Sequence, residues 1–103
     1  MKANYKLVLD FMGYHVEDDY ENPLHIKDSQ GQWVVDGREW NPETDRNCWP
    51  EIWGKLKSVE LDEYHDMSDV YYTNLGNPSF WELHAATTET CWKALIKTIK
   101  DTP

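Results

Sequence analysis

Pro50 constrains where the central helix of this chain can begin, because proline lacks a backbone N–H and clashes with the carbonyl four residues back. Taking Asn47 as the N-cap places Pro50 in the first helical turn, where a backbone N–H would have no partner in the helix. We therefore predict a helix over residues 47–58. Its apolar residues recur at helical spacing and define a buried face of Cys48, Trp49, Ile52, Trp53 and Leu56.

Two further helices are predicted from the same periodicity. Residues 3–13 place Leu7, Val8, Phe11 and Met12 on one face, and Gly13 stands where a left-handed C-terminal cap is favoured. A last helix over residues 88–100 has Thr87 or Thr88 as its N-cap. Its expected buried face comprises Cys91, Trp92, Leu95, Ile96 and Ile99.

The two cysteines lie on the buried faces of two predicted helices, each directly before a tryptophan. Cys48-Trp49 and Cys91-Trp92 sit in similar patterns that are offset by 43 residues. A buried cysteine usually acts as a small hydrophobic side chain, and this interpretation is favoured. A paired redox site remains the alternative.

Two β-hairpins are predicted between these helices. Apolar residues alternate in 24–27 and 32–35, on either side of the polar, glycine-containing turn 28–31. Residues 70–73 and 79–86 flank a second turn at 75–78, and Trp81, Leu83 and Ala85 would share the inward face of the returning strand. Residues 14–22 are expected to form a solvated loop, and residues 59–65 an edge strand or a loop. The predicted fold class is α+β: an antiparallel sheet of two hairpins layered with three helices, as an α/β/α sandwich in one domain over residues 1–103.

Net charge limits the partners of this chain. The 103 residues include 19 acidic and 10 basic side chains, which gives a formal charge of −9. Such a surface repels nucleic acid and anionic membranes, so direct nucleic-acid binding is disfavoured, whereas a basic protein surface is a compatible partner. The N-terminal residues do not form a secretory leader, and no apolar run approaches the ~20 residues of a membrane span. We expect a cytoplasmic protein with reduced cysteines, and leave its oligomeric state open.

Catalytic and metal-binding signatures are not apparent. The four histidines are scattered at no ligand spacing, and the glycine-containing loops lack the glycines and lysine of a phosphate-binding loop. We predict no catalytic residues, no metal ligands and no cofactor. Glu82 and His84 share a face of the predicted strand, and an ordinary polar contact between them is favoured over acid–base chemistry.

Two groups of residues are candidates for binding. Glu60, Asp62, Glu63 and Asp66 belong to an acidic run that lacks the pattern of an EF-hand, so it is interpreted as a solvated face or as a docking surface for a basic partner. Trp33 and Trp40 flank an Asp-Gly turn beside Arg38, and we expect them to be partly exposed. A tryptophan next to an arginine is typical of protein interfaces, although it also fits packing beneath a loop.

The chain also resembles a family of small phage and prophage proteins, the phage ABA sandwich domain. The resemblance is carried by Phe11-Met12-Gly13 at the end of the first helix, by the Pro50-x-x-x-x-Lys55-Leu56 pattern, and by the threonine-preceded helix over residues 88–100. Gly54 departs from the glutamate usual at its position, at a helix-propensity cost of up to ~1 kcal/mol. The resemblance implies an antiparallel sheet with helices against it and a bacterial host cell, and it assigns no active site.

Three hypotheses for function follow. The first is a small non-enzymatic accessory protein of phage or prophage origin that acts by protein–protein contact. The second is a narrower version, an anti-defence inhibitor whose acidic surface blocks a nucleic-acid-binding host protein. The third is a small-ligand binder or enzyme with a pocket near Trp33, Arg38 and His84.

Overall fold

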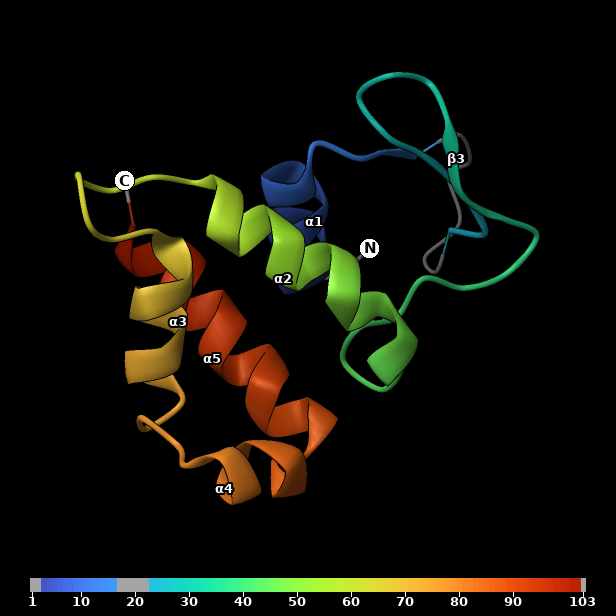
Figure 1. Ribbon diagram of the computed structural model, residues 1–103. Helices are drawn as coiled ribbons and strands as arrows, with labels where there is room; N and C mark the ends of the chain where they lie inside the picture. The colour runs from blue at the N-terminus through green and yellow to red at the C-terminus, as the bar shows by residue number, and fades with distance from the viewer. Residues whose placement is uncertain (1–2, 17–22, 103) are drawn as a thin grey trace. The chain divides into compact units, whose positions relative to one another are not determined.

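The computed structural model describes residues 3–16 and 23–102, and its fold class is α+β, as predicted. The chain divides into two compact units, residues Met1–Asn41 and Pro42–Pro103. The first contains helix α1 and a three-stranded antiparallel sheet, and the described part of the second is built mainly of helices (Figure 1).

Helix α1 spans Ala3–Met12, close to the predicted 3–13. Gly13 adopts a left-handed conformation with a φ of +72°, which favours glycine. Its N–H donates to the carbonyl of Asp10 at 3.1 Å, and the helix ends there. Val8 and Leu9 are the buried residues of α1. Of the predicted buried face, only Val8 is fully buried, because Leu7, Phe11 and Met12 are half-buried. Leu9, which was not predicted to face the core, is buried instead.

The sheet has the strand order β1-β2-β3, from His15–Val16, His25–Lys27 and Trp33–Asp36. The hairpin of β2 and β3 confirms the first predicted hairpin. Its turn is closed by Asp28, whose carboxylate accepts from the N–H groups of Gln30 and Gln32, both at 2.9 Å. Strand β1 lies in the segment 14–22 that was predicted as a loop, and residues 17–22 of that segment fall outside the described residues.

The core of the first unit is built around Trp40, which is only 2% exposed. The ring of Tyr14 meets it edge-on at 5.3 Å between centroids, and the hydroxyl of Tyr5 donates to its carbonyl at 2.7 Å. Ile26 and Val35, which are paired across the hairpin, are also buried.

The central helix begins two residues later than predicted. A short 3₁₀ helix, η1, spans Arg46–Cys48 and is capped by the side chain of Asp45, and α2 follows over Trp49–Ser58. Pro50 lies in the first turn of α2, as its missing N–H demands, but Asn47 is inside η1 and does not cap the helix. The predicted N-cap at Asn47 is therefore wrong.

The second predicted hairpin is wrong. Residues Met67–Asn74 form helix α3, and residues Phe80–Ala85 form helix α4. Each helix begins with a side-chain cap, from Asp66 and Ser79 respectively. These caps supply partners for first-turn N–H groups that a helix would otherwise leave unpaired, and this local advantage prevailed over the strand propensity of 70–73. Trp81, predicted to face inward, is 79% exposed.

Helix α5 spans Thr88–Asp101 and is capped by Thr87, in agreement with the predicted helix over 88–100. It packs against α3, and α3 packs against α2, so these three helices form the body of the second unit (Figure 1). Ile52, Leu56 and Leu95 are fully buried between them. The predicted layering of the helices over 47–58 and 88–100 on the sheet stays a prediction, because the sheet belongs to the other unit.

Candidate functional site

Of the three predicted binding residues in the first unit, two are exposed. Trp33 on β3 is 50% exposed and Arg38 is exposed, whereas Trp40 forms the core described above, so its predicted exposure is wrong. The cation that lies over the Trp33 ring is Lys27, with its Nζ 4.6 Å from the ring centroid. The pairing arises because Lys27 and Trp33 face each other across the hairpin.

The residues of the predicted small-ligand pocket are divided between the two units. Trp33 and Arg38 belong to the first unit, and His84 belongs to α4 of the second. The expectation that Glu82 and His84 share a strand face is also wrong, because residues two apart do not share a face of a helix. The carboxylate of Glu82 instead accepts from the hydroxyl of Ser79 at 3.0 Å.

The predicted acidic residues lie together in one compact loop between α2 and α3, here called the acidic loop (residues 59–66). An isolated antiparallel bridge joins Glu60 to Asp66 at its base. The N–H of Met67 donates to the carbonyl of Val59 at 2.9 Å, and the N–H of Leu61 donates to the carbonyl of His65, also at 2.9 Å. The loop is thus closed by backbone hydrogen bonds, and the alternative of a regular edge strand over 59–65 does not hold.

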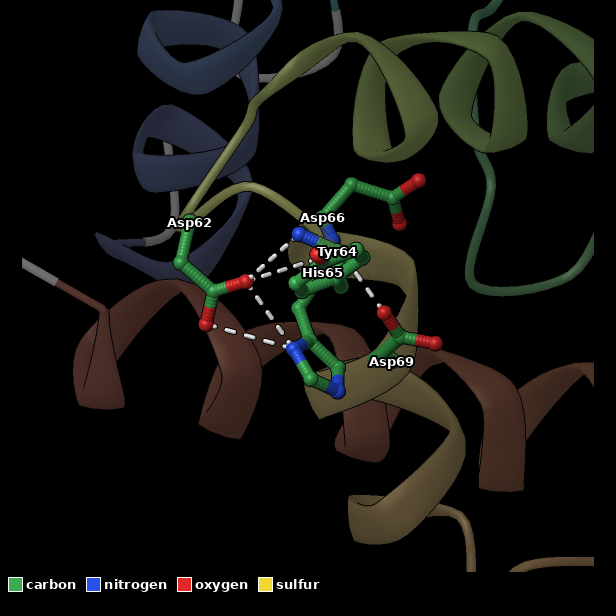
Figure 2. Close-up of polar contacts among 5 residues, drawn as sticks. All are labelled: Asp62, Tyr64, His65, Asp66 and Asp69. Atoms are coloured by element: carbon green, nitrogen blue, oxygen red, sulfur yellow. Dashed lines mark hydrogen bonds and ion pairs between the residues drawn. The ribbon is translucent and has the colours of Figure 1, made fainter.

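Asp62 organises the tip of the acidic loop (Figure 2). Its carboxylate accepts from the N–H groups of Tyr64 and His65 at 2.8 and 2.9 Å, and lies 3.0 Å from Nδ1 of His65. These hydrogen bonds, that from the Tyr64 N–H foremost, lower the pKa of Asp62. The hydrogen bond to Asp62 and its negative charge, with smaller contributions from Asp69 and Asp66, raise the pKa of His65.

Asp66 has a different task, the capping of α3. Its side chain accepts from the N–H of Ser68 at 2.9 Å. In return, the carboxylate of Asp69 accepts from the N–H of Asp66 at 3.1 Å, as Figure 2 shows. This reciprocal arrangement is a capping box. Of the four predicted acidic residues, Asp62 and Asp66 therefore hold the local structure, while Glu60 and Glu63 are exposed.

Two apolar side chains stand out among these acids. Tyr64 is 82% exposed, and Leu61 is 42% exposed. Neither residue was predicted to bind a partner, since residues 59–65 were expected to form an edge strand or a loop. The signal that could have identified the loop is an aspartate two residues before Tyr64, since aspartate side chains favour turns by accepting from nearby backbone N–H groups.

Residues 3–16 and 23–102 contain neither a metal-binding cluster nor a membrane-spanning helix. In that part of the chain, no group of three or more His, Cys, Asp or Glu side chains could hold a metal ion. No helix there is long and apolar enough to cross a membrane. Both cysteines are thiols, with Cys48 buried and Cys91 half-buried.

Comparison with known proteins gave no relative: no family model, no curated protein and no solved structure matches this chain.

Proposed function

We propose that this protein acts by binding another protein, and that the acidic loop is its docking element. The observation that carries this proposal is the exposure of Tyr64, which is 82% accessible on a loop whose backbone is fixed by hydrogen bonds. Tyrosine is enriched among the residues that dominate interface energies. A rigid loop loses little conformational freedom on binding, and this favours affinity.

The charges of the acidic loop support a basic partner. Glu60, Asp62 and Glu63 place exposed carboxylates around Tyr64, in a chain with a net charge of −9. Complementary charge speeds association and sets the orientation of partners, while burial of an aromatic anchor provides affinity. The partner surface that fits is therefore an apolar socket with basic side chains around it.

The resemblance to the phage ABA sandwich domain supports a phage or prophage origin for a protein with this docking role. A small accessory protein of a phage or prophage would act in the cytoplasm of the bacterial host. Host proteins that bind nucleic acid carry basic channels, and an acidic loop with an aromatic tip is suited to block one. The anti-defence inhibitor is in this sense the narrower form of the same proposal.

Affinity capture from a bacterial lysate, quantified by mass spectrometry, tests the docking role. We expect a basic protein that is retained by the wild type at low salt and released at high salt, because ionic screening weakens contacts between exposed charges. Tyr64→Ala should lose this protein. Trp81→Ala is the matched control, since Trp81 is similarly exposed at 79% but lies on α4.

Charge variants separate the electrostatic part of the mechanism from the aromatic part. Glu60→Gln with Glu63→Gln removes two charges from the loop while leaving the Asp62 turn and the Asp66 cap in place. We expect this double variant to bind more weakly at low salt and to show a smaller salt dependence. Equal capture by the wild type and Tyr64→Ala would rule out the acidic loop as the docking element.

A further inference from the structure

A second site lies in the helical unit, and its lining includes none of the residues that the sequence singled out for binding. Helices η1, α2, α3, α4 and α5 contribute side chains to an open groove of about 410 Å³. This volume lies within the range of small-molecule sites, roughly 300–1,000 Å³.

The groove has an aromatic wall that is held in place by contacts within the unit. The rings of Trp49 and Trp53 each lie 6.1 Å from the ring of Tyr71, measured between centroids. The indole N–H of Trp49 donates to the carbonyl of Pro42 at 2.8 Å, which fixes its orientation. Burial first, and then a hydrogen bond with Cys91, raise the pKa of Tyr71, so the phenol stays neutral and the wall carries no charge.

Among the side chains that the structure describes, the only charged one that lines the groove is that of Arg46. No carboxylate within residues 3–16 and 23–102 lines it, although the chain has 19 acidic residues against 10 basic ones. The guanidinium donates one N–H to the carbonyl of Ala86, which ties it to the segment between α4 and α5. A guanidinium has five N–H donors in a planar fork that matches a carboxylate, so this one contact leaves it the capacity to bind an anion.

We propose that this groove binds a small carboxylate with an aromatic body. The body lies against Trp49, Trp53 and Tyr71, and the carboxylate pairs with Arg46. Charge complementarity decides the sign of the ligand: an anion finds its partner at Arg46, whereas a cation would meet the one positive side chain of the lining. The proposal is independent of the docking role of the acidic loop, because no residue is shared between them.

Three probes of matched shape test this assignment: 4-phenylbutyrate, its neutral amide 4-phenylbutyramide, and the cationic 4-phenylbutylamine. Binding is followed by the shifts of the Trp49 and Trp53 indole N–H signals in ¹H–¹⁵N correlation spectra. We expect the carboxylate to bind about tenfold more tightly than the amide, as a charge-assisted hydrogen bond implies, and the amine to bind most weakly.

Two variants test whether Arg46 is the cation that pairs with the carboxylate of the ligand. Arg46→Gln should remove the preference for the carboxylate over the amide while both still shift the tryptophan signals. Lys97→Gln, which removes a cation from the exposed face of α5, should leave the preference unchanged. If Arg46→Gln does not fold, the affinities of the wild type for the carboxylate and the amide still test whether the groove prefers an anion. Equal affinities there, or no shift of either indole signal at millimolar probe, would overturn the proposal.

Discussion

At the scale of single residues, several exposed aspartates of this chain stabilise turns and helix ends. Asp28 and Asp62 each accept from two backbone N–H groups and so fix a tight turn. Asp45 and Asp66 each cap a helix. The net charge alone suggests that these side chains are only a solvated acidic surface. The structure shows that these four carboxylates also accept hydrogen bonds that fix turns and helix ends.

The ion pair of Asp62 and His65 gives a pH dependence that can be measured at one residue. His65 has a raised pKa in the folded state, so its stabilising contribution is fully present below the unfolded value of about 6.5 and is lost as pH rises through the higher folded value. Asp62 has a lowered pKa, so its contribution is present above about 3.8 and is lost as pH falls through the lower folded value. The pair therefore stabilises the acidic loop most between these two limits.

We expect an NMR titration of the His65 ring to give a pKa above 6.5. In Asp62→Asn the value should fall toward 6.5, because the main hydrogen bond to a charged partner is gone, while Asp66 and Asp69 retain a small effect. An unchanged His65 pKa in Asp62→Asn would show that the pair does not form in solution.

At the scale of elements, helix caps decided the structure of residues 66–85. The run Val70-Tyr71-Tyr72-Thr73 is rich in residues that favour strands, yet it lies within α3. Asp66 and Asp69 form a capping box at one end, and Tyr71 is buried in the core of the second unit. The spacing Ser79-x-x-Glu82 at the start of α4 is also a helix-start signature, and it could have identified this helix from the sequence.

Asp66→Ala should destabilise the protein by about 1 kcal/mol, since it removes the N-cap acceptor of α3. Asp66→Asn should cost far less, because asparagine is an equally good N-cap without the charge. The free energy of unfolding from urea titrations measures both variants, and Glu63→Ala is the control at an exposed position of the same loop. If the alanine and asparagine variants are equally destabilised, charge rather than capping accounts for the role of Asp66.

At the scale of the whole molecule, two compact units each have a core of their own. The first is centred on Trp40 with Ile26 and Val35, and the second on Ile52, Leu56 and Leu95. Both carry part of a net charge of −9, and exposed charges of one sign repel each other in the folded state.

This charge predicts that salt stabilises the protein. Raising the ionic strength from about 0.01 to 0.15 M shortens the screening length from about 30 to about 8 Å, which weakens repulsion among the acidic side chains. We expect the Tm from calorimetry to rise over this range, and to rise less in the Glu60→Gln, Glu63→Gln double variant. A Tm that falls instead would mean that screening of favourable pairs, such as Lys93 with Glu89 at 3.2 Å, outweighs the relief of repulsion.

The sequence by itself determined the features that depend on neighbours along the chain. Helical periodicity with a terminal glycine or threonine located α1 and α5, Pro50 limited the start of α2, and a turn with alternating flanks located the hairpin of β2 and β3. These signals are local because capping and turn formation are satisfied within a few residues.

Only the tertiary structure decided which side chains were covered, and packing added to the local caps in making residues 70–73 helical. Residues 70–73 have strand propensity, but they lie in a helix that is capped by Asp66 and packed on α5, and such packing outweighs intrinsic preferences of a few tenths of a kcal/mol per residue. Trp40 is buried because Tyr5 and Tyr14, more than 25 residues earlier in the chain, close around it. The groove beside Arg46 has no sequence signal at all, since its walls come from five separate helices that meet only when the second unit folds.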